Sequence, residues 1–230
     1  MPTSRSNGFC WNDFDAYVFD IDGTLLVTRD LVHYNALNAA MREVYGVNTT
    51  IDGITYHGKT DPGILRAALD RAGVSGEDFD RNLPAALQII RREVNANASA
   101  LNPAICCGIP EVLASLKSAG KLLGIASGNL ESVGWHKIEA AGLRQFFSFG
   151  CFSDKHELRV DVFRDAVAEV KSMLGQSARI CFIGDTPSDI QAARQLDANV
   201  IAVSTGTYKR EELACHDPDL CVASCGELLQ

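Results

Sequence analysis

The sequence contains no hydrophobic run that approaches the ~18 residues needed to cross a membrane, and no run of lysine and arginine. Internal repeats and low-complexity tracts are absent as well. The net charge is −8, so the charge balance does not favour nucleic acid or an anionic membrane surface as a partner. With 47% hydrophobic and 22% charged residues, the 230-residue chain has an ordinary globular composition and can bury its own core.

The cysteines lack the spacing of a disulfide scaffold or of a metal-binding pair. There are eight, too few to staple a chain of this length, and no Cys-x-x-Cys occurs. The nearest approach to a zinc-ligand set is Cys215, His216, Cys221 and Cys225, whose spacing matches none of the usual zinc motifs. Residues 1–15 contain no long apolar run, so we expect neither a signal peptide nor an anchor. We therefore expect a cytoplasmic protein with reduced thiols.

Short apolar runs alternate with helical patterns along most of the chain. Continuous hydrophobicity is typical of strands covered on both faces, so the pattern predicts an α/β fold with a mostly parallel sheet. The expected strands are residues 16–19, 122–126, 179–183 and 200–203, with further candidates at 149–152 and 220–222. The expected helices between them are residues 110–120, 130–141, 158–174 and 188–196.

Residues 28–98 interrupt this alternation, because they contain helical patterns and little strand signal. Helices are expected over residues 31–45, 60–73 and 83–94, followed by a linker at 95–108 that is rich in Asn, Ala and Ser. A helical insertion directly after the first strand predicts a second, smaller domain. We place the α/β core at residues 1–27 and 104–230, and a helical cap at residues 28–103.

The first expected strand ends in two aspartates. In the segment Tyr17-Val-Phe-Asp20-Ile-Asp22-Gly-Thr24, Asp20 and Asp22 are two residues apart, so their side chains point to the same side of an extended backbone. Two carboxylates there repel each other unless a cation or a shared proton separates them. Gly23 lets the backbone approach a ligand closely.

A second acidic pair follows a distant strand, in Ile183-Gly-Asp185-Thr-Pro-Ser-Asp189. The simplest interpretation is that Asp185 or Ser188 caps the helix that begins here. However, both acidic segments lie at carboxyl ends of parallel strands, the edge where open α/β sheets bind ligands. Four carboxylates converging there require a hard divalent cation, and ligand sets made only of oxygen favour Mg²⁺. The candidate metal ligands are Asp20, Asp22, Asp185 and Asp189.

A third strand runs into a helix at Gly124-Ile-Ala-Ser127-Gly-Asn129. A hydroxyl beside exposed backbone N–H groups at the start of a helix is typical of a phosphate site. The same residues also make ordinary turns and caps. Ser127, Gly128 and Asn129 are therefore candidate phosphate-binding residues.

Together these three segments, in this order, resemble the haloacid dehalogenase (HAD) superfamily. The resemblance is strongest to its phosphatases with a helical cap after the first strand, such as phosphoglycolate phosphatases. Lesser matches are Gly58-Lys-Thr-Asp61 in the insertion and Ala192-Ala-Arg194 near the end. The resemblance implies a Rossmann-like three-layer core with a small all-helical cap. It also implies a small phosphorylated substrate selected by the cap, for which Lys59 and Thr60 are the candidate residues.

The family also uses a basic residue, usually a lysine before a proline, between the second and last motifs. This sequence departs from that pattern, since no Lys-Pro occurs. Arg159 stands at the start of a helix where the family's lysine usually lies, and Phe163 follows at the expected distance. We take Arg159 as the residue that neutralises the phosphoryl group and keep Lys155 as the alternative.

The resemblance implies phosphoryl transfer through an aspartyl-phosphate. Asp20 attacks phosphorus, and Asp22 protonates the leaving alkoxide and later deprotonates the attacking water. Mg²⁺ is held by the Asp20 carboxylate, the Asp22 backbone carbonyl, Asp185 and Asp189. We expect a Mg²⁺-dependent phosphatase acting on a small metabolite of the phosphoglycolate or sugar-phosphate class. The substrate itself and the oligomeric state stay open.

Several other functions fit part of the pattern. A haloacid dehalogenase needs only the first aspartate and no metal, so Asp22 and Asp185 argue against it. A phosphonate hydrolase needs a cap lysine that forms a Schiff base, which makes Lys59 relevant. A phosphomutase keeps both aspartates and differs chiefly in excluding water. An inactive regulatory domain would not need the motif residues, all of which are present.

Overall fold

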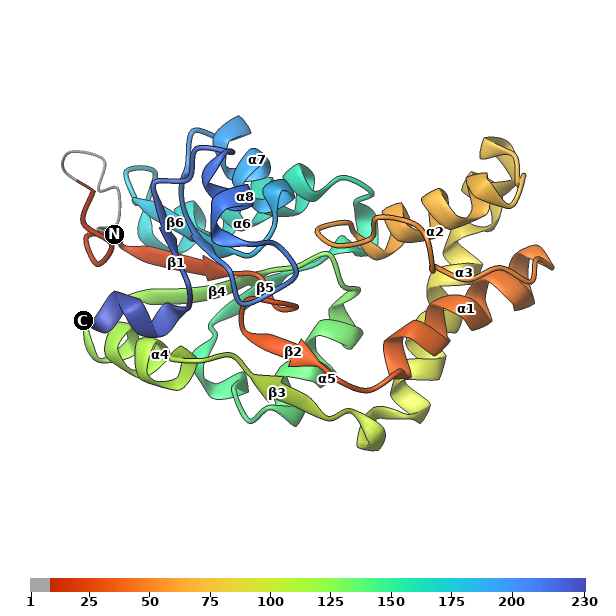
Figure 1. Cartoon of the computed structure of the whole chain (residues 1–230), viewed down its shortest axis with the longest axis horizontal. Helices are drawn as coiled ribbons and strands as arrows, with labels where there is room; N and C mark the ends of the chain where they lie inside the picture. The colour runs from red at the N-terminus through yellow and green to blue at the C-terminus, as the bar shows by residue number, and fades with distance from the viewer. Residues whose placement is uncertain (1–8) are drawn as a thin grey trace.

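A six-stranded parallel sheet forms the centre of the larger part of the molecule in the computed structural model, which describes residues 9–230 (Figure 1). Its strands are β1 (Ala16–Phe19), β4 (Leu122–Ala126), β5 (Phe149–Cys151), β6 (Ile180–Gly184), β7 (Asn199–Val203) and β8 (Leu220–Val222). They lie in the order β5-β4-β1-β6-β7-β8, and every pairing is parallel. The predicted α/β fold is confirmed. The expectation that residues 1–15 hold no signal peptide falls largely on residues 1–8, outside the described part.

Helices cover both faces of this sheet. They are α4 (Ile109–Ser118), α5 (Glu131–Ala140), α6 (Arg159–Leu174), α7 (Pro187–Gln195) and α8 (Arg210–Ala214). Side chains alternate along β1, so Tyr17 and Phe19 join the apolar cluster of α4 and α5, while Ala16 and Val18 join that of α6, α7 and α8. Because both faces are buried, the strands read as continuously hydrophobic, and the core has three layers.

The insertion lies at the other end of the molecule and has an apolar cluster of its own (Figure 1). Its helices are α1 (Val32–Tyr45), α2 (Asp61–Arg71) and α3 (Gly76–Ala96). Met41, Leu65 and Ile90 are fully buried there. Leu130 and Val133, from the start of α5, belong to the same cluster. The insertion is therefore packed against the α/β part and not merely tethered to it.

Both connections between the two parts run through a short antiparallel ribbon that the sequence patterns do not predict. In this ribbon β2 (Leu26–Thr28) pairs with β3 (Pro103–Ile105), with Leu26 opposite Ile105. Three residues are too few for an alternating pattern to be visible, so β3 lies in a segment expected to be only a linker. The ribbon holds the entry and exit of the insertion side by side.

Helix α3 is longer than predicted, since it begins at Gly76 and not at residue 83. Ser75 starts it by accepting a hydrogen bond from the backbone N–H of Asp78 (3.1 Å). Residues 76–82 are mostly charged, and Phe79 is the only apolar side chain among them, so the hydrophobic periodicity begins late. No helix among residues 9–230 is both long and apolar enough to cross a membrane.

Candidate active site

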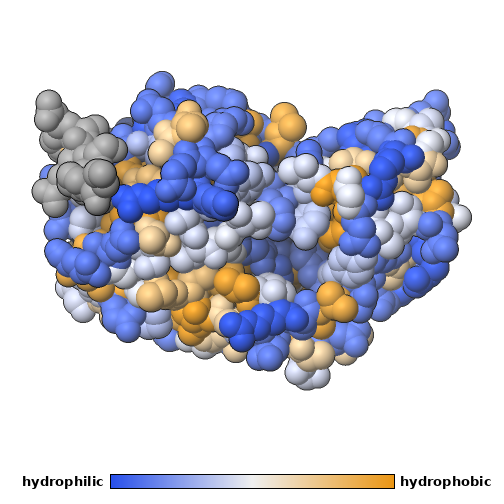
Figure 2. All heavy atoms as spheres, in the orientation of Figure 1, coloured by the Kyte–Doolittle hydropathy of each residue, from blue (hydrophilic) through white to orange (hydrophobic). Residues whose placement is uncertain are grey.

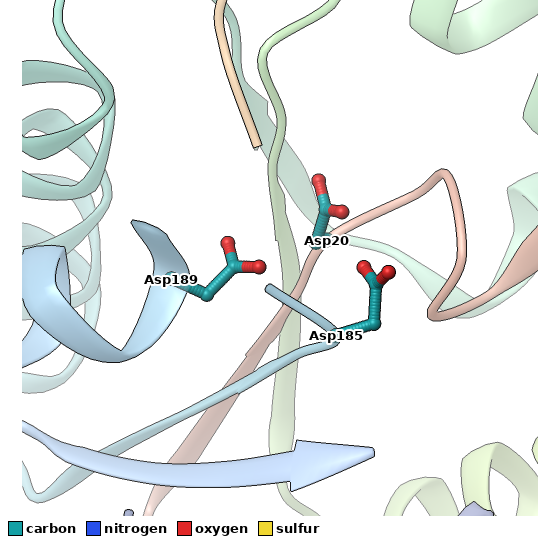
Figure 3. A group of neighbouring side chains, drawn as sticks. All are labelled: Asp20, Asp185 and Asp189. Atoms are coloured by element: carbon teal, nitrogen blue, oxygen red, sulfur yellow. The ribbon is translucent and has the colours of Figure 1, made fainter. Parts of the chain in front are cut away.

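Three buried aspartates meet where β1 and β6 end. These strands are neighbours, so Asp20 and Asp185, which directly follow them, emerge at the same edge of the sheet. Asp189 reaches the same place from the first turn of α7. The three side chains extend to the same side of the sheet edge (Figure 3), and each offers a carboxylate oxygen within 4.8 Å of the others. All three residues are at most 5% exposed.

Asp189 also closes the cap of α7. Its carboxylate accepts hydrogen bonds from the backbone N–H (3.0 Å) and the hydroxyl (2.7 Å) of Thr186, the N-cap residue. The interpretation that Asp185 or Ser188 caps this helix is therefore wrong. Asp185 instead accepts a hydrogen bond on Oδ1 from the hydroxyl of Thr24 (3.2 Å). Capping thus fixes the position of Asp189 within the cluster, and the Asp185 carboxylate takes no part in the cap.

Arg159 lies between two of these carboxylates. Its Nη2 is 2.6 Å from Asp20 Oδ1, and its Nε is 2.6 Å from Asp189 Oδ1. Burial nevertheless raises the pKa of Asp20 to about 7, because the charges of Asp189 and Asp22 add to burial while Arg159 only partly offsets them. Burial, Asp20 and Asp189 likewise raise the pKa of Asp185 well above its usual range. The single positive charge of Arg159 does not neutralise the negative charges of the three carboxylates.

The cluster is suited to a hard divalent cation. Every ligand atom it offers is a carboxylate oxygen. Two glycines surround Asp185 closely, because a Cβ on Gly23 or Gly206 would overlap its carboxylate. Burial raises the carboxyl pKa values most, and a cation among these oxygens would relieve the repulsion that adds to it. The residues present therefore fit the metal that the motif pattern implies.

The Asp22 carboxylate is not part of this cluster. Its carboxylate accepts hydrogen bonds from Lys137 (2.8 and 2.9 Å), Asn129 (2.8 Å) and Thr28 (2.8 Å). Burial opposes the ionisation of Asp22, but the Lys137 charge and these hydrogen bonds outweigh it and hold the pKa of Asp22 below its usual range. Of the four predicted carboxylate ligands, the structure therefore brings three together.

The predicted phosphate loop follows β4, the neighbour of β1 on the other side. The Ser127 hydroxyl accepts a hydrogen bond from the Asn129 amide (2.8 Å), and both residues are buried. Gly128 contributes only its backbone. Its carbonyl accepts hydrogen bonds from the Ser153 hydroxyl (2.7 Å) and from the backbone N–H of Asp61 (2.7 Å). All three loop residues line the same cavity as Asp20 and Asp22.

The structure distinguishes between the two candidate basic residues. Arg159 begins α6, is 9% exposed and contacts the nucleophile candidate Asp20. Lys155 is exposed and does not line the cavity. The geometry favours Arg159, whose fork reaches two carboxylates at once.

The cavity lies between the α/β part and the insertion, has a volume of about 520 Å³, and is visible as the hollow in Figure 2. Lys59 lines it from the insertion side. Thr60 does not line it, contrary to expectation: this residue is 1% exposed, caps α2 by accepting from the N–H of Gly63 (3.1 Å), and donates to the carbonyl of Glu157 (2.5 Å). A Thr before Asp-Pro at a helix start signals a cap, and that role takes up its hydroxyl.

Among the polar cavity residues that sequence reasoning missed are Lys137 and His33. Lys137 is 2% exposed and projects from α5 to Asp22. His33, on α1, lies 3.3 Å from the Lys137 ammonium and 3.1 Å from Asp61. One signal was available: Lys137 lies on the expected helix 130–141 between the apolar residues Val133 and Ile138, where a surface lysine is unusual.

The described part of the chain thus combines a parallel α/β sheet, acidic residues at its strand ends and a helical insertion above them. The family model for haloacid dehalogenase-like hydrolases matches residues 17–203, and the chain belongs to this family. It is 29% identical over 216 residues to a phosphoglycolate phosphatase of Synechococcus elongatus, which covers 94% of this chain and 95% of that one. A phosphoglycolate phosphatase of Caulobacter vibrioides is 29% identical over 214 residues, or 90% and 85% of the two chains.

Solved structures share the fold. The crystal structure of CbbY from Rhodobacter sphaeroides in complex with phosphate matches with a TM-score of 0.67, over 94% of this chain and 96% of that one, at 21% identity. The chain is therefore a hydrolase of the HAD superfamily, phosphoglycolate phosphatase-like in sequence.

Proposed function

We propose that the protein is a Mg²⁺-dependent phosphatase that releases inorganic phosphate from a small phosphorylated metabolite through an aspartyl-phosphate on Asp20. The observation that carries the proposal is the carboxylate cluster of Asp20, Asp185 and Asp189, with Arg159 paired to the first and last, beside the cavity. Its relatives named phosphoglycolate phosphatases support the reaction class. The proposal takes residues 28–103 as the cap, residues 1–27 and 104–230 as the core, and the cytoplasm as the location.

In the first half-reaction the Asp20 carboxylate attacks phosphorus, and the bond between phosphorus and the ester oxygen breaks. The leaving oxygen takes a proton from Asp22. Arg159 and the Ser127 hydroxyl hold the phosphoryl oxygens in place, since positioning and charge neutralisation are most of what phosphoryl transfer requires. Mg²⁺ would be held by the three-carboxylate cluster and the Asp22 backbone carbonyl, where it would supply further charge neutralisation.

In the second half-reaction water attacks phosphorus and breaks the acyl-phosphate bond to Asp20. Asp22 accepts the proton of that water, and inorganic phosphate leaves. The lowered pKa of Asp22 keeps its carboxylate charged, which fits this base role, whereas the acid role in the first half-reaction requires Asp22 to take up a proton first.

The substrate class follows from the cavity wall and the relatives. Lys59 lines the cavity, and its charge is suited to an anionic or hydroxylated substrate. A phosphorylated small acid such as phosphoglycolate, or a sugar phosphate, meets this description. We take Lys59 as the substrate-selecting residue and no longer propose Thr60 for that role.

The proposal is tested by a screen of 2-phosphoglycolate and sugar phosphates, with released phosphate as the signal. We expect turnover with Mg²⁺, none in EDTA, and recovery when Mg²⁺ is restored. Activity that persists in chelator would contradict the phosphatase proposal and favour metal-free dehalogenase chemistry. A lack of phosphate release from every ester would contradict it as well.

A further inference from the structure

A buried lysine that the proposed reaction does not use lies against Asp22. The Lys137 ammonium is 2% exposed, so it must find acceptors inside the protein for each of its three donors. Both oxygens of Asp22 lie within 2.9 Å of it, and the side-chain carbonyl of Asn129 lies at 2.9 Å. Asn129 in turn donates to the same Asp22 carboxylate (2.8 Å). Lys137 thus fixes the carboxylate directly and also through the Asn129 amide.

The remaining partner of Lys137 comes from the insertion. His33 Nδ1 lies 3.3 Å from the Lys137 ammonium. Because an ammonium can only donate, this contact requires a lone pair on Nδ1 and therefore places the ring proton on Nε2. Nε2 lies 3.1 Å from the buried carboxylate of Asp61. The ring nitrogen that then carries the proton is the one nearest Asp61, at ion-pair distance but without a formed hydrogen bond.

Asp61 connects this chain of contacts back to the α/β part. Its second carboxylate oxygen accepts the backbone N–H of Leu130 (2.9 Å), and its own N–H donates to the carbonyl of Gly128 (2.7 Å). His33 and Asp61 therefore occupy these positions only while the insertion is seated on the loop that follows β4.

We propose that Lys137 is a positioning residue that holds the Asp22 carboxylate for proton transfer. Because His33 contacts Lys137 from the insertion, Lys137 is held in this position only while the insertion is packed against the α/β part. The proposal rests on the role of Asp22 in the proposed function. Without Lys137, Thr28 and Asn129 would each keep one hydrogen bond to Asp22 (2.8 Å each), but the Asn129 amide would lose the Lys137 contact on its carbonyl oxygen. With Lys137 removed, the partly exposed Asp22 side chain can rotate into the cavity.

The principal test compares Lys137→Met with the wild type on an alkyl phosphate and on 4-nitrophenyl phosphate. We expect the kcat for the alkyl ester to fall on the order of 10- to 100-fold, because a misplaced proton donor loses much of its effect. The KM should change less than the kcat, since Lys137 contacts the phosphate loop only through the side chain of Asn129. The first half-reaction with the nitrophenyl ester, measured as the burst of nitrophenolate, should stay close to wild type because that leaving group needs no proton.

Controls separate positioning from folding. Lys117→Met removes an exposed lysine of α4 and should leave both esters unchanged. Lys137→Gln provides a second variant if the methionine destabilises the core. A purely structural role would lower the burst and the alkyl-ester rate by the same factor, and that result would overturn the proposal.

The contribution of His33 is tested by a matched pair. His33→Gln keeps an acceptor for Lys137 and a donor toward Asp61, whereas His33→Ala keeps neither. We expect His33→Ala to reproduce part of the Lys137→Met defect and His33→Gln to restore most of it. Equal activity in the two variants would contradict the link to the insertion.

Crystal structures of the wild type and of Lys137→Met decide the proposal even if no ester is turned over. We expect the Asp22 carboxylate of the variant to leave the Asn129 amide. If it stays within hydrogen-bond distance of Asn129, Lys137 does not position it and the proposal is wrong. Failure of the proposed function would appear separately, as absence of phosphate release by the wild type.

Discussion

Asp20 and Asp22 are separated by one residue, yet their surroundings shift their pKa values in opposite directions. Asp20 is buried with two other carboxylates, and its pKa rises to about 7 in the metal-free protein. Asp22 is held by Lys137, and its pKa falls below the usual range. Such divergence between neighbouring carboxyls is typical of groups with different tasks in a reaction.

This difference predicts different behaviour of two asparagine variants. Asp20→Asn removes the nucleophile, so neither turnover nor a phosphoenzyme should be measurable. Asp22→Asn keeps the nucleophile, and with a nitrophenyl ester its first half-reaction should largely recover. Water attack then lacks its base, so the aspartyl-phosphate should accumulate. Intact-protein mass spectrometry of acid-quenched samples measures the adduct.

The outcome that contradicts this assignment is equally specific. Ordinary turnover by Asp20→Asn, or an adduct that maps to Ser127, would show that the nucleophile is misassigned. The Asp20→Asn protein serves as the control for non-covalent phosphate, since it shares the same phosphate-binding loop.

The basic residue gives a second prediction at this scale. Arg159→Ala removes a preorganised charge 2.6 Å from Asp20 and should lower kcat by about 100-fold or more, as the loss of such a group costs a few kcal/mol. Arg159→Lys should recover part of the loss, because it restores the charge without the fork. Lys155→Ala, on an exposed side chain, should stay near wild type. The opposite ranking, in steady-state kinetics of folded variants, would move the role to Lys155.

Single residues also show where prediction from sequence ends. Asp20, Asp185 and Asp189 could be placed together because strand ends of a parallel sheet share an edge. The partner of Asp22 could not be predicted. Lys137 is 115 residues away in sequence, and which face of α5 points to Asp22 is set only by the packed fold. Thr60 was misjudged because its hydroxyl serves equally well as a ligand and as a helix cap.

At the scale of elements, strands and helices with strong hydrophobic patterns were predictable. Short strands that form only because two distant segments pair were not. The sheet strands are buried on both faces, so their apolar runs are plain. The β2–β3 ribbon depends on two distant three-residue segments meeting, and no local pattern records that. The first turns of α3 depend on the Ser75 cap and carry charge, so periodicity alone starts the helix too late.

The contact between the insertion and the β4 loop predicts the effect of one added methyl group. Gly128 packs against the backbone carbonyl of Lys59, and a Cβ there would overlap it. Gly128→Ala should therefore push away the segment that carries Lys59 and Asp61. We expect faster amide hydrogen exchange over residues 57–61 and a loss of stability on the order of 1–3 kcal/mol, as in other overpacked sites.

The insertion itself offers a matched control for Gly128→Ala. Gly76 has an ordinary backbone conformation, and no atom lies within 4 Å of the position that a Cβ would take there. Gly76→Ala should therefore leave both exchange and stability near wild type. If Gly128→Ala exchanges like this control, the β4 loop does not hold the insertion in place.

At the scale of the whole molecule, the carboxylate cluster opposes folding when it is charged and no cation is bound. The folded protein raises the pKa of Asp20 to about 7 and that of Asp185 well above its usual range, whereas both carboxyls ionise near pH 4 in the unfolded chain. Between about pH 4 and 7 the folded state holds protons that the unfolded state has released. The cluster's contribution to stability is therefore present at low pH and is lost as the pH rises through this window.

Mg²⁺ should reverse that loss, because it binds the deprotonated cluster and only in the folded state. We expect Mg²⁺ to raise the Tm more at pH 8 than at pH 5, as measured by thermal unfolding with Mg²⁺ and with EDTA. Asp185→Asn isolates the cluster from the other titrating groups: in EDTA its Tm advantage over wild type should grow from pH 5 to pH 8, and its response to Mg²⁺ should be small. An equal Mg²⁺ shift at both pH values, or a Tm advantage that shrinks as the pH rises, would show that these carboxylates do not form the metal site.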